Sequence, residues 1–289
     1  MRKNFDELGM LITSLLFGFS FSIQAIGAKH LDPFSFSIGK YIIAIITTIP
    51  FILRKTKTSK KDEIIYGIIL GLILFGFTNL QQVVAKEGTP GKTGFITSLY
   101  IVEVPLINFL FFKKKISLQT VISLLFSIAG LVLISDLKDF SIKTSDILTI
   151  VCSLLLASQI IVLGKCSNKC NVFKLNFYSF VVILLLSIFG YFIAGEQATL
   201  VGFKNGWFPI LYVGLGCSTI GCGLQAYCQK TLDPTTTSLI LSLESVFSVI
   251  SGYLILDATL SKIEIVGCIL MFIGVILCIT DQKKTKKTK

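Results

Sequence analysis

The chain has 289 residues, of which 53% are hydrophobic and only 15% are charged, and its net charge is +11. Soluble domains carry about 25% charged residues, so this composition excludes an ordinary soluble protein and indicates that lipid surrounds most of the chain. The excess of Lys and Arg is then expected in cytoplasmic loops, which argues against a nucleic-acid-binding role.

Ten apolar segments are long enough to span a bilayer, because a spanning helix needs about 20 residues. The first has no convincing small-residue cleavage site after it, so we expect it to be retained rather than removed as a signal peptide. The sequence therefore predicts an all-α integral membrane protein with ten transmembrane helices. The segments lie at residues 8–28, 34–53, 64–85, 92–112, 116–135, 145–165, 173–194, 206–228, 235–256 and 261–280.

The charges of the connecting loops predict the orientation of these helices. Of the 27 Lys and Arg residues, 19 lie at the two termini and in one alternate set of loops, whereas seven lie in the other set. Because basic loops stay in the cytoplasm, we expect both termini, including the Lys-rich tail, on the cytoplasmic side of the plasma membrane.

The chain repeats part of its own sequence after a shift of 144 residues. Between Pro90 and Leu133 the shift produces ten identities without a gap, beginning with Pro90 on Pro234. Each repeat holds five helices, an odd number, so the second repeat enters the membrane from the opposite side. We therefore expect two inverted five-helix repeats, residues 1–140 and 141–289, with a substrate site between them.

Residues for cofactor chemistry are scarce. The only histidine is His30, and most of the eight cysteines lie in apolar segments. Cys166 and Cys170 share a polar loop, but no second pair of ligands completes a metal site. The chain also lacks a Gly-rich phosphate loop that ends in Lys and Ser or Thr. We expect neither metal nor cofactor and no enzymatic activity.

Two longer runs are specific enough to suggest a family. The first extends from Thr89 to Val102 (TPGKTGFITSLYIV) and is followed by Pro105; the second is Asp233-Pro234 followed by residues 238–247 (SLILSLESVF). They resemble the fourth- and ninth-helix signatures of EamA-type transporters in the drug/metabolite transporter superfamily. The resemblance extends over essentially the whole chain.

The resemblance implies ten helices in two inverted repeats and secondary transport of small organic solutes such as amino acids, related metabolites or drugs. Lys40 stands where the family often has Arg, and Ser245 stands where Pro is usual after the Glu. Glu103 stands where an apolar residue is more common, a departure relevant to substrate choice.

Charged side chains inside hydrocarbon cost about 2.5–3.5 kcal/mol each, so they are candidates for function. Glu103 and Glu244 lie near the middle of the fourth and ninth helices, and Lys40 lies in the second. The shift places Tyr100 opposite Glu244, one helical turn from Glu103, so both carboxylates are expected to face one cavity. There they would bind an amino group or a proton. In the structural alternative, Glu244 bonds a helix end and Glu103 pairs with Lys40.

Uncharged polar residues within the apolar segments form a second group of candidates. Gln81 and Gln225 are related by the shift, which favours contact with a substrate, whereas hydrogen bonding between helices is the alternative role. The group comprises Asn79, Gln81, Tyr100, Gln225 and Ser242.

Together these features predict a secondary transporter, an exporter that works by alternating access with proton coupling or exchange. Its partners would be a small-molecule substrate and membrane lipid. A passive facilitator and a non-transporting membrane sensor or scaffold are the alternatives.

Overall fold

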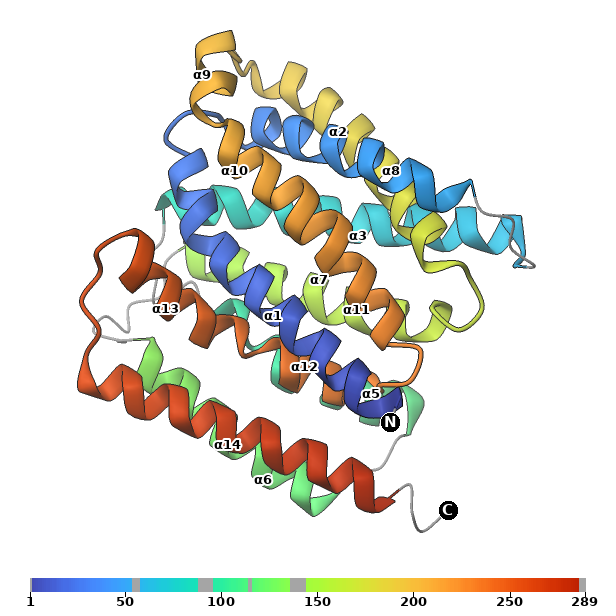
Figure 1. Cartoon of the computed structure of the whole chain (residues 1–289), viewed down its shortest axis with the longest axis vertical. Coiled ribbons are helices and arrows are strands. Elements are labelled where there is room, and N and C mark those ends of the chain that lie inside the picture. Colours follow the sequence, from blue (N-terminus) through green and yellow to red (C-terminus); the bar gives the residue numbers. More distant parts are fainter. Residues whose placement is uncertain (1, 54–57, 88–95, 114–115, 136–143, 286–289) are drawn as a thin grey trace.

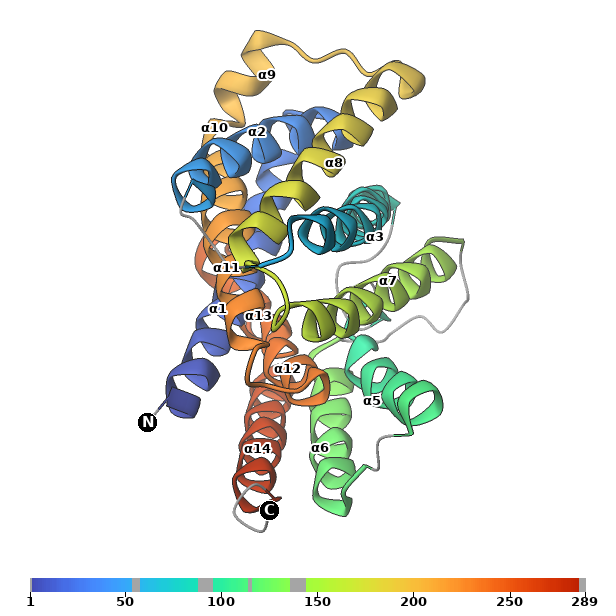
Figure 2. The same cartoon turned by 90° about the vertical axis from the view of Figure 1, so that its right-hand side faces the viewer.

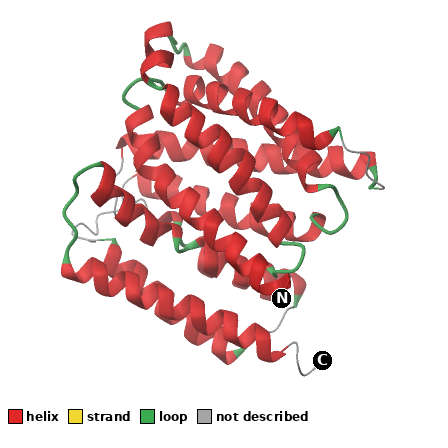
Figure 3. Ribbon diagram, viewed as in Figure 1, coloured by secondary structure: helices red, strands yellow, loops and turns green. Residues whose placement is uncertain are grey.

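The computed structural model describes residues 2–53, 58–87, 96–113, 116–135 and 144–285, and within these ranges every regular element is a helix (Figure 3). Residues 89–95 of the first motif lie outside the described ranges, as does Pro90 of the repeat. The first half contains α1 (Arg2–Gly27), α2 (Pro33–Ile52), α3 (Lys60–Glu87), α5 (Tyr100–Phe112) and α6 (Leu118–Ile134). The second half contains α7 (Thr144–Cys166), α8 (Val172–Ala194), α9 (Leu200–Asn205), α10 (Trp207–Leu211), the π-helix η1 (Tyr212–Gly221), α11 (Cys222–Cys228), α12 (Pro234–Leu241), α13 (Glu244–Ile255) and α14 (Lys262–Thr285).

Eight helical spans in the described ranges are long and apolar enough to cross a membrane; α10–η1–α11 and α12–α13 each count as one span. This confirms eight of the ten expected segments. The other two contain α5 and α6, which are apolar but have only 13 and 17 residues. At 1.5 Å per residue α6 is about 26 Å long, slightly less than the bilayer core. The expected segment 92–112 begins outside the described ranges.

The helix ends gather at two opposite edges of the bundle (Figure 1). The first turn of α1 and the last turn of α14 lie at the right-hand edge, together with the α7–α8 and α11–α12 connections. The α1–α2 and α13–α14 connections lie at the left-hand edge. Large apolar side chains such as Phe111, Leu118 and Phe192 are more than 70% exposed on the outside, as lipid-facing residues should be.

Glycine allows the backbones of two helices to touch where α6 and α14 lie side by side (Figures 1 and 2). A Cβ atom on Gly130 would lie 2.5 Å from the Gly267 carbonyl oxygen, and one on Gly267 would lie 2.6 Å from the Gly130 carbonyl oxygen. Because lipid tails are as apolar as these side chains, close packing of this kind replaces hydrophobic burial as the force between helices.

Two carboxylates join helices of opposite halves at opposite edges of the bundle. Glu196, just beyond the end of α8, accepts hydrogen bonds from the backbone N–H groups of Phe34 (3.0 Å) and Ser35 (2.8 Å) and from the Ser35 hydroxyl. These are orphan donors of the first turn of α2, and the positive end of a helix dipole favours the negative charge. Glu196 therefore caps α2 from the other half of the chain.

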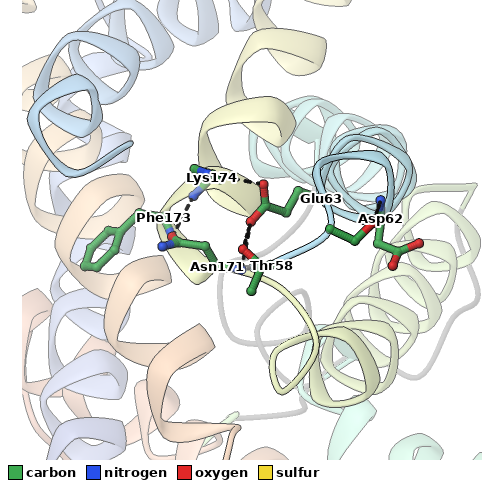
Figure 4. A network of polar contacts seen from close by, with 7 residues as sticks. Thr58, Asp62, Glu63, Asn171, Phe173 and Lys174 are labelled. Carbon is green, nitrogen blue, oxygen red and sulfur yellow. Dashed lines mark hydrogen bonds and ion pairs between the residues drawn. The ribbon is translucent and has the colours of Figure 1, made fainter. Parts of the chain in front are cut away.

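Glu63, in the first turn of α3, makes the corresponding contact at the start of α8 (Figure 4). Its buried carboxylate accepts from the Thr58 hydroxyl and from the Asn171 N–H at 3.3 Å, and it lies 3.6 Å from the Lys174 ammonium. Asn171 itself caps α8, because its side-chain oxygen accepts from the N–H groups of Phe173 and Lys174. Each half thus supplies a carboxylate to the start of the second helix of the other half.

Replacing Gly18 by Ala should separate α1 from α13. The added Cβ would lie 2.4 Å from Phe247 Cβ and 2.6 Å from the Glu244 carbonyl oxygen, neither of which can move without shifting backbone. We expect a loss of about 1–3 kcal/mol of stability, measured as a lower Tm of the detergent-purified protein. Gly252→Ala is the control, because its nearest neighbour would be 3.9 Å away. Equal Tm values for the two variants would contradict this packing.

Replacing Glu63 by Ala should destabilise the protein by about 1–3 kcal/mol more than Asp62→Ala does, because only Glu63 contacts the start of α8, at the Asn171 N–H and the Lys174 ammonium. Asp62 is a suitable control: it lies in the same first turn, and its backbone N–H bonds Ser59 of its own segment. Denaturation in detergent micelles measures the difference. Two variants of equal stability would show that the contact with α8 contributes nothing.

Candidate functional site

A central cavity with a volume of about 810 Å³, counting the part that opens to the outside, lies among helices of both halves. The space inside it in which the centre of a water-sized molecule fits is about 100 Å³. Most of its wall is apolar and aromatic, with a few charged and amide side chains. Five of the eight residues predicted from the sequence line it: Lys40, Gln81, Tyr100, Gln225 and Glu244.

The helices that carry Tyr100 and Glu244 are both interrupted directly before these residues. A two-residue turn at Ser98 and Leu99 precedes α5, and a turn at Ser242 and Leu243 separates α12 from α13. The shift of 144 residues brings the two interruptions into register. Each turn releases backbone from the regular helix pattern at depth, which is tolerated in a membrane protein where the segment is buried in protein or lines a cavity.

Tyr100 and Glu244 contact each other in the cavity wall. The Tyr100 hydroxyl donates a hydrogen bond of 2.9 Å to Glu244 Oε1, and the side chains of both residues are buried. The two partners are 144 residues apart, which is the repeat shift. Glu244 Oε2 accepts no hydrogen bond from any residue in the described ranges. The carboxylate is therefore held by one oxygen, and the other is available to a ligand.

Lys40 brings a cation to the same cavity. Its side chain is only 2% exposed, and Nζ lies 5.6 Å from the centre of the Phe36 ring and 5.1 Å from that of Tyr41. Among the described residues no carboxylate comes within ion-pair distance of Lys40. Gly214 allows η1 to approach α2 closely, since a Cβ there would lie 2.6 Å from the Lys40 carbonyl oxygen. The aromatic faces stabilise the ammonium but leave it without a counter-charge.

The expected regular helix at 206–228 contains ten residues of π-helix, which the sequence reasoning missed. π-Helical turns inside α-helices are rare and often lie at functional sites. Here η1 supplies Cys217 and Ser218 to the cavity wall, and Thr219 holds it through bonds to the Gly214 carbonyl oxygen and the Thr47 hydroxyl. The glycine-rich composition of this stretch was the available signal, and it is equally compatible with close packing of a regular helix.

The predicted glutamines have two different environments. Gln225 Nε2 donates a hydrogen bond of 3.1 Å to Gln159 Oε1, so this side chain joins α11 to α7 as well as lining the cavity. Gln81 lines the cavity from α3. For Gln225 the structural and the ligand-binding roles that we had considered are therefore both compatible with its position.

Three predicted residues lie away from the cavity wall. Glu103 accepts a hydrogen bond of 2.8 Å from the Ser153 hydroxyl of α7, because α7 packs against this side of α5. It neither shares the cavity with Glu244 nor pairs with Lys40, and its assignment as a substrate residue stays a prediction. Asn79 accepts from the Ser37 hydroxyl and donates to its own helix, and the Ser242 hydroxyl bonds the Leu239 carbonyl oxygen.

A bundle of apolar helices around a partly polar central cavity is the architecture of a membrane carrier. The comparisons with known proteins agree. The chain belongs to the EamA-like transporter family, whose model matches residues 5–136 and again residues 143–280. It is 25% identical over 281 residues to an uncharacterized transporter of Archaeoglobus fulgidus, covering 96% of this chain and 86% of that protein.

The fold is also found among solved structures. In one crystal structure of a protein, 97% of the chain matches 96% of this chain, with a TM-score of 0.74 and 16% sequence identity. The chain is therefore a multi-pass membrane protein of a transporter family, with a small-molecule substrate as its expected ligand.

A double-mutant cycle tests the Tyr100–Glu244 bond without knowledge of a substrate. Tyr100→Phe and Glu244→Gln should be coupled by about 0.5–3 kcal/mol in free energy of unfolding, because the two side chains bond each other. Tyr100→Phe with Asp62→Asn is the control cycle and should be additive, since Asp62 and Tyr100 share no contact. Additivity in both cycles would contradict the bond.

Proposed function

We propose that this protein is a secondary carrier that binds a small organic solute in the central cavity and exposes it alternately to the two faces of the membrane. In this proposal it has ten crossings, both termini in the cytoplasm of the plasma membrane, and two inverted repeats, residues 1–140 and 141–289. It acts as an exporter of solutes such as amino acids or related metabolites, by proton coupling or exchange.

The observation that carries the proposal is the contact between Tyr100 and Glu244. Residues that are equivalent in two repeats can touch each other only close to the axis that relates the repeats. Their hydrogen bond of 2.9 Å therefore supports an axis that passes through the wall of the cavity. If the two halves exchange conformations about such an axis, the site stays in place while its opening changes from one face to the other.

Three further features support the same interpretation. The helix interruptions coincide under the shift of 144 residues, and the family model matches the chain twice, once in each half. The first turn of α1, the last turn of α14 and the α7–α8 connection, all of which carry basic residues, lie at one edge of the bundle in Figure 1, which is consistent with a cytoplasmic edge.

Export is tested in cells. Cells that express the protein should accumulate at least one metabolite in the medium that control cells retain, and Glu244→Gln should abolish the difference because Glu244 lies in the cavity wall. Identical media from expressing and control cells would contradict an exporter. A wild-type effect that Glu244→Gln leaves unchanged would contradict the site.

Coupling and topology complete this test. Counterflow of the identified solute in proteoliposomes, with and without a pH gradient, separates proton coupling from exchange and from passive facilitation.

Peptide tags inserted after the third and the eighth crossings, within residues 88–95 and 229–233, should be accessible from opposite sides of the membrane. Access from one side only would rule out inverted repeats, and a failure of all exchange would favour the sensor or scaffold alternative.

A further inference from the structure

We propose that Lys40 and Glu244 are two halves of one binding site that selects zwitterions, solutes that carry an anionic and a cationic group on a small apolar body. The inference rests on the proposed function, since it names the class of solute that the cavity takes. Lys40 binds the anionic group of the solute, and Glu244 binds its ammonium group.

The first support is that the charge on Lys40 has no internal partner. A buried ammonium needs a counter-charge or several acceptors, and Lys40 has only the faces of Phe36 and Tyr41 within the described ranges. A structural lysine at this depth would be expected to bond a carboxylate or backbone carbonyl groups. A cation that is 2% exposed, unpaired and in the wall of a cavity is instead arranged for an anion that arrives from outside.

The second support is that Glu244 offers the complementary half. Its Oε1 is occupied by the Tyr100 hydroxyl, which orients the carboxylate, and Oε2 accepts no bond from the described residues. Lys40 and Glu244 are not in ion-pair contact with each other, although both line one cavity. A ligand that places opposite charges against the two side chains therefore neutralises both, whereas a ligand with a single charge leaves one of them buried and unpaired.

The third support is the rest of the cavity wall. Phe17, Phe21, Leu74, Phe77 and Phe180 make much of it apolar. Such a wall favours a hydrocarbon side chain and disfavours additional charge. The number of charged groups is matched, one cation and one anion, so the occupied site is neutral overall. Neutrality lowers the cost of closing the loaded site off from water.

The experiment uses the full-length protein purified in detergent and in proteoliposomes. Two sets of probes are compared, each an amino acid, its amine and its acid: leucine, 3-methylbutylamine and 4-methylpentanoate, and phenylalanine, phenethylamine and 3-phenylpropanoate. In at least one set the zwitterion should bind and exchange, and both single-charge analogues should bind about tenfold more weakly or worse. An amine or acid that binds as tightly as its zwitterion overturns the proposal.

Variants of Lys40 test whether this side chain binds the anionic group of the zwitterion. Lys40→Met should weaken binding of the zwitterion about tenfold or more without weakening binding of the amine, and Lys40→Arg should restore the zwitterion. Lys165→Met is the matched control, because Lys165 lies over the Phe112 ring outside the cavity wall. Wild-type affinity of Lys40→Met for the zwitterion overturns the assignment. If Lys40→Met does not fold, the comparison of probes on the wild-type protein still decides.

Failure of this inference is distinct from failure of the proposed function. If the wild-type protein binds none of the six probes but exports another solute that lacks paired charges, the proposed zwitterion site is wrong and the proposed carrier function is supported. If the vesicles exchange nothing from a total extract of cell metabolites, both proposals fall.

Discussion

Inside a bilayer no water is available to complete the hydrogen bonds of polar groups, so each group must find its partner within the protein. This constraint accounts for most of the polar contacts here. Glu196 accepts from N–H groups in the first turn of α2, Glu63 accepts from the N–H of Asn171 just before α8, and hydroxyls such as that of Ser242 bond their own helices. In the cavity, Lys40 and one oxygen of Glu244 keep bonding capacity that the described residues do not use. Residual capacity at depth is what a binding site requires.

The cavity and the internal repeat are connected by one hydrogen bond. Tyr100 and Glu244 occupy equivalent positions in the two repeats, follow equivalent helix interruptions and contact each other. A site placed where equivalent residues meet belongs equally to both halves, and a rearrangement of one half against the other does not displace it. The carboxylate caps at the two edges extend the relation, since each half supplies one to the second helix of the other. Contacts between the halves therefore join the bundle at the cavity and at these two edges.

Helix positions, family and several site residues were predictable because long apolar runs and isolated charges carry strong local signals. Lys40 and Glu244 were candidates on the cost of burying a charge alone, and the structure places both in the cavity. The same reasoning could not place Glu103, because the cost of a buried charge says nothing about which neighbour it faces; Ser153 of α7 satisfies it away from the cavity. Glu63 and Glu196 were not singled out at all, since acidic residues near helix ends are ordinary in a sequence. The π-helix η1 was missed because a run of glycines and small residues is equally compatible with a close-packed α-helix.

By itself the sequence determined that the chain is a helical membrane protein of the EamA type, with an internal repeat of 144 residues and a small number of charges in apolar segments. These properties depend on the composition and on the order of residues along the chain, so they can be read without knowing which residues meet in space. Only the tertiary structure decided which charges share a cavity, that the repeat partners Tyr100 and Glu244 touch, and that Lys40 has no carboxylate beside it. Such facts depend on the rotation of each helix and on contacts between residues far apart in the chain, and no local pattern records them.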